Sequence, residues 1–332
     1  MKATSFNTGW TCRHLGSSAP GTPVTLPHDA MLAEERSQAS AGGTNTGWFA
    51  GYDYLYEKHF TPDAAQAAQC AVLEFEGVYH NAEVHLNGEK IASCPYGYSD
   101  FYADLTGKLL PGRDNVLEVI AHNADQPNSR WYSGAGIYRP VTLWTAPARH
   151  ILPDGVQVRT LSIDPAEVEV TVQTTASGAV AVAILDDEQT VATAQAESNG
   201  KAVLRVQIPN AKLWSPDSPA LYRCRAMFGD DCAETTFGVR TLSWGDVGFL
   251  RNGKRVILLG ACVHHDHGVL GACCYPEAEE RKVRLLQKVG YNAVRCAHNP
   301  CSKAFLDACD RLGMLVMDEY ADMWYIHKTQ YD

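Results

Sequence analysis

The chain has 332 residues, of which 45% are hydrophobic and 20% charged, as expected for a soluble globular protein with roughly two domains of ~150 residues, or three smaller ones. Its 38 acidic and 28 basic side chains give a formal net charge of −10 at pH 7. This composition argues against a disordered chain. The acidic balance argues against nucleic acid as a partner, because negative surfaces repel phosphate backbones.

Neither a membrane span nor a secretion signal is expected. No apolar run approaches the ~20 residues of a transmembrane helix, and Met1–Trp10 lacks an apolar signal core. The 11 cysteines are therefore expected to be mostly reduced, in the cytoplasm. They show no C-x-x-C spacing, so we expect no metal held by cysteine and no other cofactor.

Residues 1–147 alternate between apolar and polar side chains over short stretches. Val84 and Leu86 alternate with polar neighbours, and the following pair Asn87-Gly88 is typical of a two-residue hairpin turn. Proline and glycine separate the other apolar stretches. Many short strands with such turns predict a jelly-roll β-sandwich that ends at a linker near residue 147.

Residues 148–243 repeat the alternating pattern with longer strands. Val168, Val170 and Val172 alternate with Glu167, Glu169 and Thr171. A block of about 100 residues with this pattern predicts an immunoglobulin-like sandwich.

In residues 244–332 the hydrophobic period changes. Val256–Val263 is a continuous apolar run, which predicts a strand buried on both faces. Pro276 is expected to open a helix and Ser302 to cap a second one. Short strands are expected after each helix, so the order is β-α-β-α-β, the opening of a (β/α)₈ (TIM) barrel or another parallel α/β sheet.

Polar residues follow each of these three strands. They are His264-His265-Asp266, His298-Asn299 and Asp318-Glu319. Because the carboxyl ends of parallel strands share one edge of the sheet, where ligands bind in α/β folds, we predict a site at this edge. The pattern does not specify the chemistry.

The residue types leave several interpretations open. His264, His265 and His267 with Asp266 fit a metal cluster, hydrogen bonds to a polar ligand or structural polarity, and we favour the ligand because the spacing lacks the i, i+4 pattern of H-E-x-x-H. His298 is favoured as functional by its place at a strand end. Arg295 could act with it or could be a buried structural cation paired with an acid from a neighbouring strand.

Asp318 and Glu319 are unsuitable as a pair of catalytic carboxylates. Adjacent residues on a strand point to opposite faces. A retaining glycosidase needs two carboxyl groups ~5–5.5 Å apart in one pocket. We therefore expect only one of the two acids to face the site.

A loop of the first domain, Asn128–Gly136, carries Arg130, Trp131 and Tyr132. Aromatic rings next to amide and guanidinium donors suit sugars, which offer apolar ring faces and hydroxyl edges. The same rings could instead pack against a neighbouring domain, and residue types alone favour neither interpretation.

Several segments together resemble the family 2 glycoside hydrolases, the group of β-galactosidases, β-glucuronidases and β-mannosidases. The similar segments occur in the family's order along nearly the whole chain: VTLPHD (24–29), SRWYSGAGIYR (129–139), LWSPDSPALY (213–222), FGVRT (237–241), 249–271, NAVRCAHNP (292–300) and FLDACDRLGMLVMDE (305–319). The resemblance implies a sugar-binding jelly roll, an immunoglobulin-like sandwich and a (β/α)₈ catalytic barrel.

The chain departs from the family where the catalytic residues lie. The family's acid/base glutamate follows an asparagine at the fourth barrel strand, and its nucleophile lies on the seventh, whereas the residues here account for three strands. No catalytic residue can therefore be assigned. The resemblance implies these carbohydrate-binding residues, with no metal: Arg130, Trp131, His264, His298, Asn299, Asp322 and Trp324.

These observations predict a truncated retaining glycosidase that is inactive by itself. Its first-choice substrate is a terminal β-galactoside and its second a β-glucuronide, since no Arg-Lys fork for a sugar carboxylate is evident. A non-catalytic carbohydrate-binding protein and a metal-dependent hydrolase are the rival hypotheses. The open edge of a partial barrel favours disorder or self-association, so a homo-oligomer is also expected.

Overall fold

The computed structural model describes residues 1–67, 69–321 and 326–331. The first domain consists of two antiparallel sheets, ordered β1-β10-β5-β8 and β3-β2-β4-β9-β6-β7. Its strands are β1 Lys2–Ser5, β2 Trp10–His14, β3 Thr22–Val24, β4 Tyr54–Phe60, β5 Cys70–Phe75, β6 Ala82–Leu86, β7 Glu89–Cys94, β8 Phe101–Asp104, β9 Asn115–Ala121 and β10 Val141–Ala146. The one short α-helix, α1, spans Ala64–Ala67, and two 3-10 turns span Ala30–Ala33 and Gly43–Thr46.

The two sheets enclose one apolar core that the alternating pattern anticipates. Leu73, Leu117 and Val119 are fully buried between the sheets. The predicted hairpin is confirmed, since Asn87 and Gly88 join β6 to β7 with φ angles of 52° and 85°. A two-residue type I′ turn requires this left-handed backbone at both positions, which Asn and Gly tolerate.

The second domain is the predicted sandwich, and two long bent strands run through it. Its strands are β11 Ile151–Ile163, β12 Ala166–Asp186, β13 Gln189–Gln207, β14 Tyr222–Phe228 and β15 Asp231–Phe237. β11 pairs with the first half of β12 and β14 with the second half, and the β12–β13 register shifts between Gln173 and Ser177. A strand that bends in this way can contribute to both layers of a sandwich.

The third segment begins with an antiparallel hairpin and continues as βαβαβ. Strands β16 Leu242–Gly245, β17 Gly248–Arg251 and β18 Lys254–Arg255 form the hairpin. β19 Gly260–Val263, α2 Pro276–Lys288, β20 Ala293–Cys296, α3 Lys303–Leu312 and β21 Leu315–Met317 follow, and the three strands pair in parallel in the order β19-β20-β21. The predicted cap is observed, because Ser302 Oγ accepts from Phe305 N. Gly313 ends α3 in the left-handed conformation.

The prediction that Val256–Val263 is buried on both faces is wrong. Only Gly260–Val263 is a strand, and Ile257 and Leu259 are 69% and 53% exposed. The helices pack on one face of the sheet, where Val283, Val294 and Phe305 share a core. The other face carries an open apolar hollow lined by Trp244, Phe249, Leu258, Cys262 and Met317 among others, and no layer of the described residues covers it.

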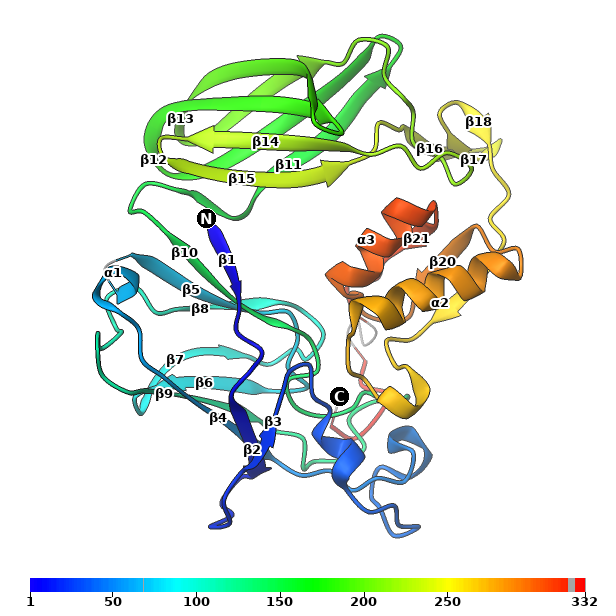
Figure 1. The fold of residues 1–332 in the computed structure, drawn as a ribbon. Helices are drawn as coiled ribbons and strands as arrows, with labels where there is room; N and C mark the ends of the chain where they lie inside the picture. The colour runs from blue at the N-terminus through cyan, green and yellow to red at the C-terminus, as the bar shows by residue number, and fades with distance from the viewer. Residues whose placement is uncertain (68, 322–325, 332) are drawn as a thin grey trace.

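The three parts of the chain contact one another directly. Figure 1 shows the jelly roll at the bottom, the sandwich at the top and the α/β segment beside both. Lys303 Nζ on α3 binds Glu74 of the jelly roll and lies 3.1 Å from Asp154 Oδ2 of the sandwich. Trp214 Nε1 donates to Asp310 O at 2.8 Å. No helix among the described residues is long and apolar enough to cross a membrane.

Glu76, directly after β5, should make stability depend on pH. Burial, and then the neighbouring charge of Glu74, raises the pKa of Glu76 to about 7. As pH rises from the unfolded value near 4.5 to about 7, the unfolded chain loses this proton first, so the folded state loses stability. We expect Glu76→Gln to raise the free energy of unfolding by about 3 kcal/mol at pH 8 and to change little at pH 4.

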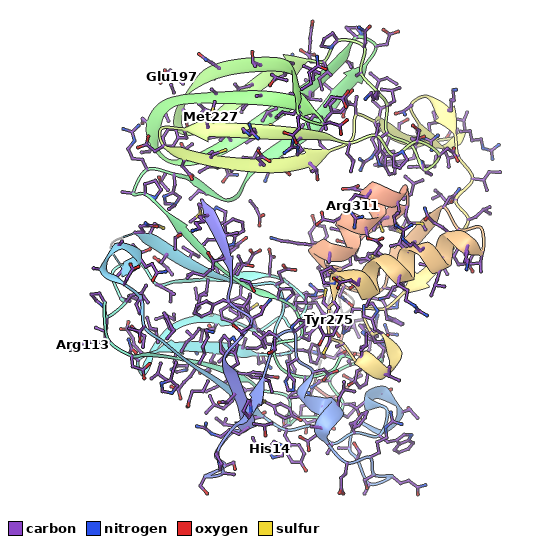
Figure 2. The ribbon with its side chains drawn as sticks, viewed as in Figure 1. His14, Arg113, Glu197, Met227, Tyr275 and Arg311 are labelled. Atoms are coloured by element: carbon purple, nitrogen blue, oxygen red, sulfur yellow. The ribbon has the colours of Figure 1, made fainter. Side chains whose placement is uncertain are left out.

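Urea unfolding at the two pH values measures this difference. Glu197, an exposed glutamate on β13 (Figure 2), supplies the control variant Glu197→Gln, which should leave stability unchanged at both. A gain of equal size at pH 4 and pH 8 would contradict the assignment, because only ionisation of Glu76 predicts the difference.

Candidate functional site

The carboxyl ends of β19, β20 and β21 bring residues from three sequence motifs together. His264 follows β19, His298 follows β20 by two residues, and Glu319 follows β21 by two residues. The strands are parallel and adjacent, so their ends meet at one edge as expected. The structure thus creates one polar edge from segments more than fifty residues apart in the sequence.

Trp131 of the first domain packs onto this edge. Its ring stacks on His264, with centroids 5.3 Å apart and planes 11° apart, and lies 5.4 Å from the His298 ring. The guanidinium of Arg130, an exposed residue, lies 5.5 Å from the Trp131 ring. Of the two alternatives that the sequence left open, packing against a neighbouring part of the chain is observed for Trp131, beside the strand-end histidines. Contact with a sugar stays a prediction.

Glu319 connects Arg295 and His298 at this edge. Its Oε1 accepts from Arg295 Nε at 2.6 Å, and its Oε2 lies 3.1 Å from His298 Nδ1. A carboxylate only accepts, so Nδ1 of His298 carries a proton and Nε2 is the ring atom left to meet a ligand. Arg295 pairs with an acid that follows the neighbouring strand, but it is not the buried cation of that alternative, because its side chain is 42% exposed.

The two adjacent acids after β21 do point apart. Asp318 Oδ1 accepts from the backbone N–H of Cys301 at 3.1 Å, on the side of the loop before α3, whereas Glu319 faces His298. The expectation that only one of the two acids faces the site agrees with this geometry, but the sequence did not indicate that this acid is Glu319. A signal for Glu319 was present in the sequence, because Arg295 on the neighbouring strand needs an acidic partner.

The three histidines after β19 make contacts in three different places. His264 Nδ1 donates to Ala297 O at 2.6 Å, which fixes its ring at the site. His265 is half-buried and bonds Ser133 O through Nε2, and loss of solvent around the ring, with Arg139 nearby, lowers its pKa to about 3. His267 Nε2 lies 3.4 Å from Glu279 Oε2. Among the described residues these histidines belong to no group of three ligand atoms close enough to share a metal ion.

The other predicted site residues are placed as follows. Asn299 is only 4% exposed and lines a small internal cavity behind the histidines. Asp322 and Trp324 lie outside the described residues. Contact of Arg130, Trp131, His264, His298 and Asn299 with a sugar stays a prediction, because the structure contains no ligand.

Asp29 fixes the loop that carries Trp131. Its carboxylate is 2% exposed and accepts four hydrogen bonds, from the backbone N–H groups of Met31, Ala135 and Ala272 and from the Tyr132 hydroxyl, at 2.7–3.1 Å. Burial raises the pKa of Asp29, and the four donors oppose this shift. Ala272 belongs to the segment between β19 and α2, so one carboxylate joins the loop to the α/β segment.

Further contacts close the same junction. The hydroxyl of Tyr275, at the start of α2, donates to Pro27 O at 3.4 Å (Figure 2). Tyr96 donates to Tyr320 O at 3.0 Å, from the first domain to the segment after β21. Arg139 is buried and donates to Pro300 O at 2.8 Å. The first domain therefore forms one wall of the site.

The fold and the site define a multidomain protein in which a jelly-roll loop completes the polar edge of a TIM-barrel segment. Three domain models of one family match in this order: the galactose-binding domain-like model at residues 10–149, the family 2 model at 153–240 and the TIM barrel model at 245–327. The chain belongs to family 2 of the glycosyl hydrolases.

Known relatives are longer than this chain. It is 37% identical to the β-galactosidase BoGH2A of Bacteroides ovatus over 98% of its own length and 42% of that protein. A putative β-glucuronidase of Formosa agariphila is 32% identical, over 91% of this chain and 30% of that protein.

Solved structures show the same arrangement. A family 2 member from Bacteroides cellulosilyticus matches all of this chain with a TM-score of 0.92 at 34% identity, and the match covers 47% of that structure. A β-glycosidase from Bacteroides vulgatus matches with a TM-score of 0.90 at 29% identity and is covered to 46%. The chain thus spans less than half of these relatives.

Proposed function

We propose that this chain forms the sugar-binding and first barrel part of a retaining glycoside hydrolase that acts on terminal β-linked sugars. One observation carries the proposal: Trp131 stacks on His264 beside His298, and His298 is held by Glu319. An aromatic ring can pack on the apolar face of a sugar, and the neighbouring ring nitrogens can form hydrogen bonds with its hydroxyls. The whole protein's two carboxylates would come from later barrel strands.

The exposed face of the three-stranded sheet supports this proposal. Met317 on that face is 57% exposed, and Trp244 of β16, which borders the same apolar hollow, is 81% exposed. Soluble proteins seldom leave a contiguous apolar patch of this kind uncovered. In a closed (β/α)₈ barrel, side chains from all eight strands fill this space, and the matched relatives have the additional length that such a barrel needs.

A β-galactoside is the first-choice substrate. The relative with 37% identity is named a β-galactosidase. A β-glucuronide is the second candidate, because another relative is named a putative β-glucuronidase. Parallel assays of the full-length protein on chromogenic β-galactoside and β-glucuronide separate the two. A non-catalytic carbohydrate-binding protein would bind these sugars without turnover.

We also propose a reducing compartment such as the cytoplasm for the protein. All 11 cysteines are free thiols, and six of them are buried. Thiols in this number persist where glutathione and thioredoxin keep them reduced. Fractionation of the source cells, followed by thiol counting on the denatured protein, tests the proposal.

His298→Ala in the full-length protein tests the site directly. Losing one polar contact to the substrate should cost about 1–3 kcal/mol, or roughly a tenfold to hundredfold fall in kcat/KM. The exposed His59 of the jelly roll supplies the control, His59→Ala, which should leave kinetics unchanged. If the His298→Ala protein folds and its kinetics are unchanged, this histidine has only a structural role.

A further inference from the structure

Two cysteines and an aspartate meet behind the candidate sugar site. The Sγ atoms of Cys296 and Cys301 and a carboxylate oxygen of Asp318 all lie within 4.8 Å of one another. Cys296 ends β20, Cys301 precedes α3 and Asp318 follows β21. Their spacing along the sequence gave no reason to expect this group, because the fold and not a C-x-x-C motif brings the thiols together.

The loop that joins the two thiols is already fixed. The backbone N–H of Cys301 donates to Asp318 Oδ1 at 3.1 Å, which orients the carboxylate toward the cluster. Arg139 holds Pro300 O at 2.8 Å from the first domain. A ligand would therefore meet donors whose backbone needs little reorganisation, which favours binding.

A cavity beside the thiols supplies a second observation. It measures about 20 Å³ and is lined by Cys296, Cys301 and Asn299, among others, which is room for about one water molecule. Asn299 is 4% exposed, and its Oδ1 has no hydrogen-bond partner among the described residues. A buried acceptor without a donor costs free energy. We therefore expect a hydrogen-bond donor, such as a water molecule, to occupy this cavity.

We propose that Cys296, Cys301 and Asp318 bind one thiophilic divalent cation of the Zn²⁺ type. Two thiolates and one carboxylate are ligands that zinc accepts, and a water in the cavity beside Asn299 would complete four-coordination. Soft thiolates disfavour Mg²⁺ and Ca²⁺, which prefer oxygen ligands. The proposal is independent of the glycosidase assignment.

Binding would exchange protons for the metal without any redox step. Each thiol loses its proton to the solvent as its sulfur–metal bond forms, so two protons are released per cation. The bound cation would connect the end of β20, the start of α3 and the end of β21. Two of these segments carry His298 and Glu319, so the cation would rigidify the neighbouring edge.

The test uses the 332-residue chain in a phosphine reductant, titrated with Zn²⁺ and separately with Co²⁺. We expect one Zn²⁺ per chain that survives gel filtration and is released to a chromogenic chelator. Co²⁺ should give the near-ultraviolet charge-transfer bands of cobalt–thiolate bonds. Cys301→Ser should weaken Zn²⁺ binding at least about tenfold and reduce the cobalt–thiolate bands by about half, since one of two thiolates is lost.

Two further variants make the outcome decisive. Cys232→Ser changes an exposed cysteine on β15 of the sandwich and should leave both titrations unchanged. Asp318→Asn keeps both thiols, so it should weaken Zn²⁺ binding while the cobalt–thiolate bands remain. This variant tests the site even if Cys301→Ser fails to fold. Absence of Zn²⁺ binding to the folded chain, or binding that Cys301→Ser leaves as tight, would overturn the proposal.

Discussion

Residues 1–332, purified from a host without its own glycosidases, should release no product from chromogenic β-galactosides or β-glucuronides. A retaining glycosidase needs two carboxyl groups ~5–5.5 Å apart on either side of the glycosidic bond. At the candidate site Glu319 is held by Arg295 and His298, and Asp318 turns away to the Cys301 backbone. With these contacts, neither Glu319 nor Asp318 is placed to protonate the leaving group while the other attacks the anomeric carbon.

The control for this experiment is a longer protein that contains the later barrel strands. It should turn over at least one of the two substrates under the same conditions. Turnover that co-purifies with residues 1–332 and disappears in Glu319→Gln or Asp318→Asn would contradict the prediction. It would show that an adjacent acid is catalytic despite the geometry described here.

Local signals in the sequence predicted the secondary structure well. The turn at Asn87-Gly88 and the caps at Ser302 and Gly313 depend on single residues whose backbone or side-chain preferences are strong. The run Val256–Val263 was misjudged for a different reason. Hydrophobicity predicts that a strand should be buried, but burial also requires a second layer, which the described residues do not supply on that face.

The sequence predicted where in the fold the site lies, but not which side chains contact one another there. Parallel strands place His264 and His298 at one edge whatever the tertiary details. Glu319 was not singled out because its contact with Arg295 depends on how the chain turns after β21, which single-sequence patterns leave open. The proximity of Cys296 to Cys301 has the same origin, because it depends on how the loop between β20 and α3 turns.

Asp29→Ala should be among the most destabilising single substitutions in this chain. The change removes the shared acceptor of three backbone N–H groups and the Tyr132 hydroxyl, all of them in a buried setting. Leaving such donors unpaired costs about 1–3 kcal/mol each before water enters or the loop relaxes. We expect a total loss of about 3–5 kcal/mol in the free energy of unfolding, measured by urea denaturation.

Two control variants separate the hydrogen bonds from other effects. Asp29→Asn keeps the shape and one acceptor oxygen but places an amide donor against one of the N–H groups, so its loss should be intermediate. Asp230→Ala removes an exposed acid at the turn between β14 and β15 and should change stability by less than about 0.5 kcal/mol. Equal losses for Asp29→Ala and Asp230→Ala would show that the buried carboxylate does not hold the Trp131 loop.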